Sequence, residues 1–303
     1  MGMTPLQRYI AEEIAADHAD GLLNRREALR RLGLLGFGVP AAAALLAACA
    51  SEQTEPPVTT QAPSAATPST PPGMSTALMA TPITFAGPGN RELQGAWAAA
   101  AQPRGGVLVV HENKGLTDHI RSVTGRFAGA GYSALAVDLL SEKGGTAAFT
   151  DPAQATAELS NTPQEQFLAD LRAGLDELGR RVPGGRLGTT GFCFGGGLVW
   201  LLLASGPSPL DAATPFYGPF PDKGDLSAAK AAVLGIYAEA DARVGATRPA
   251  AEAALQRTAA PHEIWVAPNA DHAFFNDTGP RYAPAAAEEA WRRVLAWYAA
   301  HLG

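Results

Sequence analysis

A cysteine framed by glycines stands in the stretch GFCFGGG, residues 191–197, between two apolar runs of the sequence. The order glycine, any residue, nucleophile, any residue, glycine is that of a nucleophile elbow, with Cys193 in the place of the nucleophile. Such a strand-to-helix turn requires residues without Cβ, because the two backbones pass very close. The N-terminus of the following helix would favour a thiolate and an oxyanion, with the main-chain N–H of Phe194 as one donor of the oxyanion hole.

Two other interpretations of GFCFGGG are a phosphate-binding loop and a tight packing turn. The glycines at 191, 195, 196 and 197 do not have the G-x-G-x-x-G spacing of dinucleotide-binding loops. A P-loop is excluded because no Lys-Ser/Thr pair follows. A small buried cysteine packed where a helix meets a sheet remains the alternative to a nucleophile.

A thiol nucleophile needs a base, and the base needs an orienting acid. His272 follows the apolar run HEIWVAP, and Asp241 follows the apolar run VLGIYAE, so both can reach the edge at which strands end. The order Cys193, Asp241, His272 is the nucleophile, acid and base order of α/β-hydrolases. Asp271 is a rival for the orienting acid, although a sequence neighbour usually points away from the imidazole.

Glu112 stands in VLVVHENKGL, just past the first long apolar run. It is either a solvated loop acid that caps the next helix or a carboxylate turned toward the thiol, near the oxyanion hole.

The elements that must position these residues alternate between strand-like and helix-like patterns from about residue 81. Residues 81–87 and 93–100 predict a leading hairpin. Short apolar runs predict buried strands within residues 104–112, 132–140, 186–192, 212–218, 232–241 and 262–268. Amphipathic patterns predict helices at residues 119–131, 163–181 and 283–302. This alternation predicts an α/β fold with a mostly parallel central sheet flanked by helices.

Composition restricts the class of protein. Of 303 residues, 47% are hydrophobic and 17% charged, which allows a sizeable core, and a net charge of −6 without a long basic run argues against a nucleic-acid partner. The two cysteines, Cys49 and Cys193, stand in unrelated contexts, so a disulfide framework is not expected. No pattern indicates a metal or an organic cofactor, and the oligomeric state is not determined by the sequence.

The first 81 residues have a different character. Residues 1–49 contain paired arginines, Arg25 and Arg26, an Ala/Gly-rich apolar run and the ending LAAC, which resemble a twin-arginine signal and the lipobox of bacterial lipoproteins. The alternative is an amphipathic helix over about residues 5–35. Residues 50–81 are rich in Pro, Ser, Thr and Ala, which predicts a disordered tether. We therefore expect an exported protein that is either anchored to the outer face of the cytoplasmic membrane or located in the periplasm. Its contact with the membrane would be only through a lipid on Cys49. The catalytic domain is expected over residues 82–303.

Four motifs in one order, VHENKGL, GFCFGGG, AEADARV and DHAFFND, resemble the dienelactone hydrolase family over about residues 83–302. The resemblance implies an α/β-hydrolase fold, hydrolysis of an ester or lactone, and a Cys193–His272–Asp241 triad. It implies that Glu112 helps to generate the thiolate once substrate binds. It also implies an oxyanion hole formed by the N–H of Phe194 and an N–H near Asn113.

One position departs from the family's pattern. The family holds its substrate carboxylate with arginines, one of them four residues after the histidine, where this chain has Asn276. The loop that follows the second buried strand also has no arginine, and Lys143 is the candidate substitute there, as a point charge and not as a bidentate fork. We therefore expect hydrolysis of a small-molecule ester or lactone, with a thioesterase or other acyl-hydrolase and a non-catalytic surface lipoprotein as alternatives.

Overall fold

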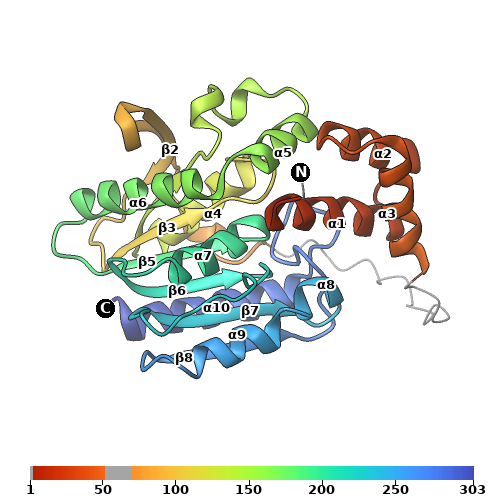
Figure 1. Cartoon of the computed structure of the whole chain (residues 1–303). Helices are drawn as coiled ribbons and strands as arrows, with labels where there is room; N and C mark the ends of the chain where they lie inside the picture. The colour runs from red at the N-terminus through yellow and green to blue at the C-terminus, as the bar shows by residue number, and fades with distance from the viewer. Residues whose placement is uncertain (1–2, 52–69) are drawn as a thin grey trace. The chain divides into compact units, whose positions relative to one another are not determined.

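The computed structural model describes residues 3–51 and 70–303 of the chain, which fall into two compact units. The larger unit comprises residues 70–148 and 163–303 and contains the sheet (Figure 1). The smaller unit comprises the described residues before 70 together with residues 149–162. The predicted functional residues from Glu112 onward therefore all belong to the larger unit.

Eight strands of the described residues form one sheet in the order β1-β2-β4-β3-β5-β6-β7-β8. The pairs β1/β2 and β2/β4 are antiparallel, and the other neighbours are parallel. The strands are Thr81–Ala86 (β1), Glu92–Ala98 (β2), Gly106–Val110 (β3), Ser133–Val137 (β4), Leu187–Phe192 (β5), Leu210–Phe216 (β6), Ala232–Ala238 (β7) and His262–Ala267 (β8). The predicted α/β-hydrolase fold, with a hairpin leading into a mostly parallel sheet, is confirmed.

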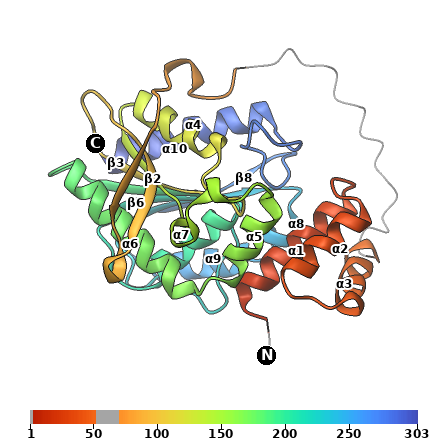
Figure 2. The ribbon, with the colours of Figure 1, turned by 90° about the horizontal axis from the view of Figure 1, so that it is seen from above.

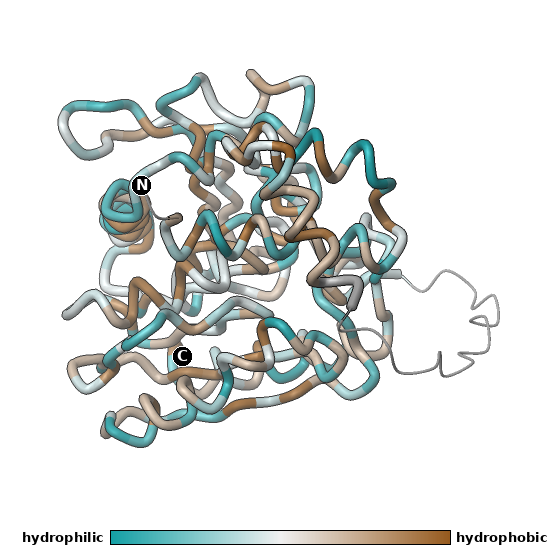
Figure 3. Tube along the Cα trace, turned by 45° about the vertical axis from the view of Figure 1, so that its right-hand side comes forward, coloured by the Kyte–Doolittle hydropathy of each residue, from teal (hydrophilic) through white to brown (hydrophobic). Residues whose placement is uncertain are grey.

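Helices cover both faces of this sheet (Figure 2). Helices α4 (Asp118–Gly129) and α10 (Pro284–His301) lie together on one face, where the rings of Phe127 and Trp291 are 4.8 Å apart. Helices α6 (Gln164–Arg181), α7 (Phe194–Ala204) and α9 (Arg248–Leu255) lie on the other. Every residue of β3, β4, β5 and β7 is buried, which explains why these strands are continuous apolar runs. Hydrophobic and hydrophilic stretches alternate along the chain trace in Figure 3.

The parallel strands bring distant parts of the sequence to one edge of the sheet. Strands β3, β5, β6, β7 and β8 run in the same direction, so their carboxyl ends meet at that edge. Glu112 follows β3, Cys193 follows β5, Asp241 follows β7 and His272 follows β8. The topology thus places all four predicted side chains at the edge where α/β sheets bind ligands.

The smaller unit consists of helices α1 (Pro5–Ala19), α2 (Arg25–Leu34), α3 (Val39–Ser51) and α5 (Pro152–Asn161). Asn24 caps α2 by accepting a hydrogen bond from the N–H of Glu27, and Arg30 of α2 pairs with Asp151 at 2.7 Å. The break at Gly21, where φ is 75°, divides the single helix that was the alternative interpretation of residues 5–35. Within residues 3–51 and 70–303, each helix is too short or too polar to cross a bilayer.

The predicted tether is described only in part, because residues 52–69 and the side chain of Cys49 lie outside the described part of the chain. Residues 70–80 run along α4, which differs from the expected boundary of the tether at residue 81. The N–H of Leu78 donates to the carbonyl oxygen of Gly125 at 3.0 Å. A Cβ at Gly125 would lie 1.9 Å from Leu78 O, and one at Gly129 would lie 2.0 Å from Thr76 O. Two glycines of α4 thus allow the preceding segment to pack directly on the helix backbone.

We predict that Gly125→Ala loosens residues 74–79 from α4 and lowers the free energy of unfolding by about 1–3 kcal/mol, because the new methyl group meets a backbone oxygen. Limited proteolysis should cut the variant near Leu78 and Met79 faster than the wild type. The control is Gly179→Ala in α6, where the new Cβ would lie 3.7 Å from Leu187 and only an ordinary contact results. That variant should be as stable as the wild type or slightly more stable. Equal proteolysis of both variants would contradict the proposed packing.

Candidate active site

Cys193 lies at the junction of β5 and α7 in a backbone conformation that few residues other than glycine adopt. Its φ is 56° and its ψ is −119°, a strain of about 1–3 kcal/mol that surrounding contacts must hold in place. A Cβ at Gly191 would lie 2.2 Å from the carbonyl oxygen of Gly195. A Cβ at Gly195 would lie 2.4 Å from the carbonyl oxygen of Val110. The glycines therefore permit a contact of strand, turn and helix backbones that the predicted elbow requires.

Main-chain hydrogen bonds fix this turn. The N–H of Cys193 donates to Phe216 O at 3.1 Å, and the N–H of Gly197 donates to Cys193 O at 3.1 Å. Phe194 is the first residue of α7, where main-chain N–H groups have no partner within the helix. The ring of Phe194 is buried and packs edge-on against Phe167, with centroids 5.4 Å apart. The turn thus presents the thiol at the positive end of a helix, with an N–H of the type that an oxyanion hole uses.

His272 and Asp241 form a close, buried pair beside the thiol. His272 Nδ1 and Asp241 Oδ2 are 2.6 Å apart, and both residues are 6% exposed. Asp241 also accepts a hydrogen bond from the N–H of Val244 at 3.0 Å, which fixes the carboxylate. A ring nitrogen of His272 lies within 4.8 Å of Cys193 Sγ. Because Asp241 binds Nδ1, Nε2 is the nitrogen that can accept the thiol proton.

Charge and burial act in opposite directions on this pair. Burial lowers the pKa of His272, but the negative charge of the Cys193 thiolate and the hydrogen bond with Asp241 together raise the pKa well above 6.5. Burial raises the pKa of Asp241, but the hydrogen bond and the charge of His272 outweigh it and hold the pKa below 3.8. The site therefore favours a proton on His272 and a negative charge on Asp241.

Glu112 is held by Asn276, which lies in the loop that carries His272. Asn276 Nδ2 donates to Glu112 Oε2 at 2.7 Å. Asn276 Oδ1 accepts two hydrogen bonds from Thr278, from its N–H at 3.0 Å and from its hydroxyl at 2.7 Å, so the orientation of the amide is fixed. Glu112 is 6% exposed and Asn113 is 7% exposed. Glu112 is thus a buried acid with a defined partner, and it is not a solvated loop acid.

Asp277, which the sequence did not single out, anchors the same loop to α4. Its carboxylate lies 2.6 Å from His119 Nδ1 and 2.7 Å from Arg126 NH2. The side chain of Arg126 is completely buried and that of His119 nearly so. Nothing in the spacing of DHAFFND distinguishes this acid from Asp271, so only the packing of α4 identifies its role.

The rival acid Asp271 bonds to the main chain of His272 and to Arg281, whereas Asp241 binds the imidazole. Asp271 Oδ1 accepts a hydrogen bond from the main-chain N–H of His272 at 2.6 Å, and its Oδ2 is 3.1 Å from Arg281 Nε. His111, the nearest histidine in the sequence to Glu112, is also occupied structurally. Its Nε2 accepts from the N–H of Leu139 at 3.1 Å, and burial lowers its pKa.

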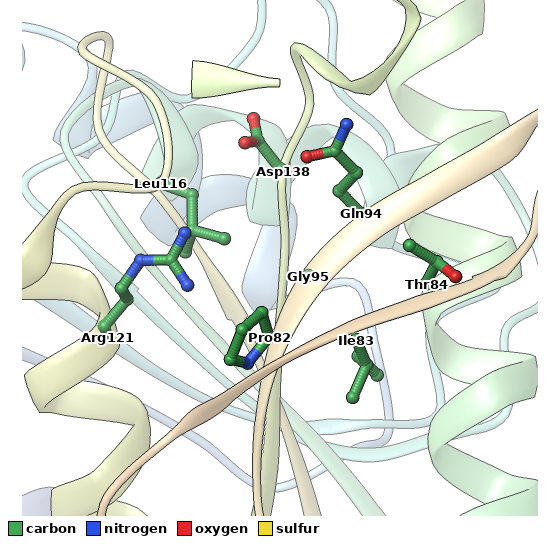
Figure 4. A pocket seen from close by; sticks show the side chains of 8 residues that line it. All are labelled: Pro82, Ile83, Thr84, Gln94, Gly95, Leu116, Arg121 and Asp138. Carbon is green, nitrogen blue, oxygen red and sulfur yellow. The ribbon is translucent and has the colours of Figure 1, made fainter. Parts of the chain in front are cut away.

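A pocket of about 340 Å³ lies beside the hairpin at the edge of the sheet (Figure 4). Its lining residues are Pro82, Ile83, Thr84, Gln94, Gly95, Leu116, Arg121 and Asp138. None of them is a predicted functional residue. The Asp138 carboxylate accepts hydrogen bonds from the N–H and the hydroxyl of Thr146, at 2.7 and 2.9 Å, and therefore organises the loop after β4. This pocket is separate from the side chains around Cys193.

The sequence and the fold of this chain are similar to those of known proteins. Residues 93–302 match the sequence model of the Dienelactone hydrolase family. A candidate carboxymethylenebutenolidase of Salmonella typhi is 35% identical over 212 residues, covering 65% of this chain and 77% of the relative. A similar candidate of Escherichia coli O157:H7 is 36% identical over 207 residues, covering 63% and 75%. The crystal structure of a candidate dienelactone hydrolase from Klebsiella pneumoniae has a TM-score of 0.64 and 32% identity, covering 73% of this chain and 98% of that one.

We predict that Asp241→Asn lowers the pKa of His272. The substitution removes the charge and weakens the hydrogen bond that Asp241 supplies against the effect of burial, while the contribution of Cys193 remains. The His272 resonances in an NMR titration give this pKa directly. Asp271→Asn is the control, because that carboxylate contacts Arg281 and the main chain, and it should leave the titration close to that of the wild type. If Asp271→Asn shifted the pKa of His272 strongly and Asp241→Asn did not, Asp271 would be the acid that orients the imidazole.

Proposed function

We propose that this chain, which belongs to the dienelactone hydrolase family, hydrolyses carboxylic esters or lactones through Cys193 and a covalent acyl-enzyme. The observation that carries the proposal is the combination at one sheet edge of a thiol on a strained elbow and the His272–Asp241 pair beside it. A packing cysteine would need neither a left-handed backbone nor a buried imidazole with a raised pKa. The packing-turn interpretation of GFCFGGG explains neither feature.

In the proposed reaction, His272 Nε2 takes the proton of Cys193, and the sulfur attacks the acyl carbon. The carbonyl electron pair moves to oxygen, where the N–H of Phe194 and an N–H near Asn113 stabilise the oxyanion. When the tetrahedral intermediate collapses, the C–O bond breaks and His272 gives its proton to the leaving alkoxide. Water then attacks the thioester with His272 as base, which releases the acid and restores the thiol.

Asn276 and Glu112 define the acyl group that we expect. A neutral amide, and not a cation, faces the Glu112 carboxylate, and the neighbouring Arg126 is paired with Asp277. A substrate carboxylate placed here would meet a buried negative charge on Glu112. We therefore propose neutral esters or lactones as substrates, with the carboxylate-bearing dienelactones disfavoured.

We predict that Cys193→Ala lowers kcat/KM on p-nitrophenyl butyrate by a factor of about 10³ or more, because the nucleophile is lost. Intact-protein mass spectrometry after rapid acid quenching should show one butyryl group on the wild type and none on this variant. Cys49→Ala removes the other cysteine and is the matched control, with unchanged hydrolysis and acylation expected. Acylation of another residue, or full activity of Cys193→Ala, would refute the nucleophile assignment. In the same assay, thioesters test which leaving group the protein prefers. A carboxylate-bearing ester tests whether a negative charge on the acyl group is tolerated.

We also propose that residues 1–49 direct export and that Cys49 carries a lipid. The supporting features are the LAAC ending and the paired arginines, Arg25 and Arg26, which are exposed in the first turn of α2. By contrast, Arg31 of the same helix pairs with Glu27 at 2.7 Å. The exposed side chains of Arg25 and Arg26 are accessible to a transport receptor, whereas Arg31 forms an ion pair within its own helix.

We predict that the full chain, produced in a bacterium with twin-arginine and lipoprotein export, incorporates labelled palmitate and fractionates with membranes. Cys49→Ala should lose the label, and the double variant Arg25→Lys/Arg26→Lys should remain in the cytoplasm. Cys193→Ala is the matched control, because it removes the other thiol and should leave both label and location unchanged. Palmitate on Cys49→Ala, or none on the wild type, would contradict lipidation at this residue.

A further inference from the structure

Tyr217 has a strained backbone next to the elbow. It follows β6 directly, and its φ of 33° lies in the region that favours glycine. The N–H of Tyr217 donates to Ile236 O at 2.7 Å, and the preceding carbonyl, that of Phe216, accepts the hydrogen bond from Cys193 N–H. A Cβ at the following residue, Gly218, would lie 2.1 Å from the nitrogen of Gly197. The close packing of the end of β6 on the start of α7 therefore holds this strained conformation in place.

The phenol ring lies among the site residues. Tyr217 is completely buried. Its ring centroid is 5.3 Å from that of His272, in an edge-on arrangement, and 5.4 Å from that of Phe274. The ring thus supports the imidazole, a role that phenylalanine could fill equally well. The hydroxyl group needs a separate explanation.

The hydroxyl of Tyr217 is completely buried and has no hydrogen-bond acceptor among residues 3–51 and 70–303. An unmatched buried hydroxyl costs about 1–3 kcal/mol. The same fold shows how a structural tyrosine is treated, because Tyr298 donates to Thr189 O at 2.8 Å and its oxygen lies 2.8 Å from Thr214 Oγ1. An unmatched donor in a native structure calls for an explanation, and a role in function is one such explanation.

Two negatively charged groups act on this hydroxyl. Burial raises the pKa of Tyr217 well above 10, the charges of Glu112 and then of Cys193 raise it further, and a main-chain hydrogen bond with Phe275 lowers it, so the group remains a proton donor at every physiological pH. Asp277 acts more weakly on Tyr217, and His272 interacts with Cys193. Glu112 Oε2 already accepts a hydrogen bond from Asn276. The charge on the sulfur forms during the reaction, beside the His272 ring against which Tyr217 packs, so we take the sulfur as the acceptor.

We propose that Tyr217 is a further catalytic residue, whose hydroxyl donates a hydrogen bond to the Cys193 sulfur when the sulfur is a thiolate. No bond is made or broken at the phenol, which keeps its proton throughout. Catalytic hydrogen bonds are often long in the resting enzyme and shorten when charge develops. The inference rests on the proposed nucleophile, but it concerns the ionisation of the thiol, which can be measured without any substrate.

The test is the pH dependence of Cys193 alkylation by iodoacetamide in the full-length protein, compared between the wild type and Tyr217→Phe. Mass spectrometry assigns the label to Cys193. Loss of the donor should raise the apparent pKa of alkylation by about one unit and lower kcat/KM for p-nitrophenyl butyrate near pH 7 about tenfold. The melting temperature should stay close to that of the wild type, because the ring and its contacts are kept. An unchanged alkylation pKa overturns the proposal, whatever happens to activity.

Two further variants secure this result. Tyr132→Phe removes another buried hydroxyl without a partner in the described residues, at the opposite edge of the sheet, and should change neither alkylation nor activity. An equal shift from Tyr132→Phe would overturn the assignment to Tyr217. If Tyr217→Phe does not fold, 3-fluorotyrosine placed at 217 keeps the ring and makes the hydroxyl a stronger donor. It should lower the alkylation pKa, and an unchanged or raised value overturns the proposal. Normal thiol titration without ester hydrolysis would refute the proposed function and leave this inference intact.

Discussion

The close contact of three backbone segments at Cys193 is the constraint on which the rest of the site depends. Strand β5, helix α7 and the end of β3 meet where Gly191 and Gly195 have no side chains, and Cys193 must adopt a left-handed conformation between them. A methyl group at either glycine would overlap a carbonyl oxygen. The energy that holds this turn comes from the buried sheet around it. The thiol is therefore fixed by the fold, and the other groups need only approach from neighbouring strand ends.

The second requirement of the site is that each of its buried carboxylates has a partner. Asp241 is matched by His272, Asp277 by Arg126 and His119, and Glu112 by the amide of Asn276. Only the last of these pairs has no positive member. A buried carboxylate with a neutral donor is less stabilised than one in an ion pair, so it resists any further negative charge nearby. The amide at position 276 thus gives Glu112 a neutral donor where an arginine would supply a positive charge.

Much of this arrangement could be predicted from the sequence, because the relevant signals are local. Continuous apolar runs identify strands buried on both faces, and the residue that follows each run lies at the functional edge. Cys193, Asp241, His272 and Glu112 were found in this way. The roles of Asp277 and Tyr217 could not be predicted, because they depend on which distant helix or strand end packs against them. The packing of residues 70–80 on α4 was missed for a similar reason. Their Pro/Ser/Thr/Ala-rich composition indicates little capacity to form a core, but glycines in a distant helix provide a surface for their backbone.

Two residues with strained backbones and a buried hydroxyl without an acceptor lie together at the carboxyl ends of the strands. Cys193 and Tyr217 both have positive φ, and both lie where β5 and β6 end against α7. Tyr298, in the interior of the same unit, has a fully matched hydroxyl. A fold selected only for stability would relax the two strained residues and pair the Tyr217 hydroxyl. The free energy lost through the strained residues and the unmatched hydroxyl is small compared with the stabilisation that burial of the sheet provides. The native fold can therefore keep the proposed donor, Tyr217, and the proposed nucleophile, Cys193, in positions that would become favourable when negative charge forms on the sulfur.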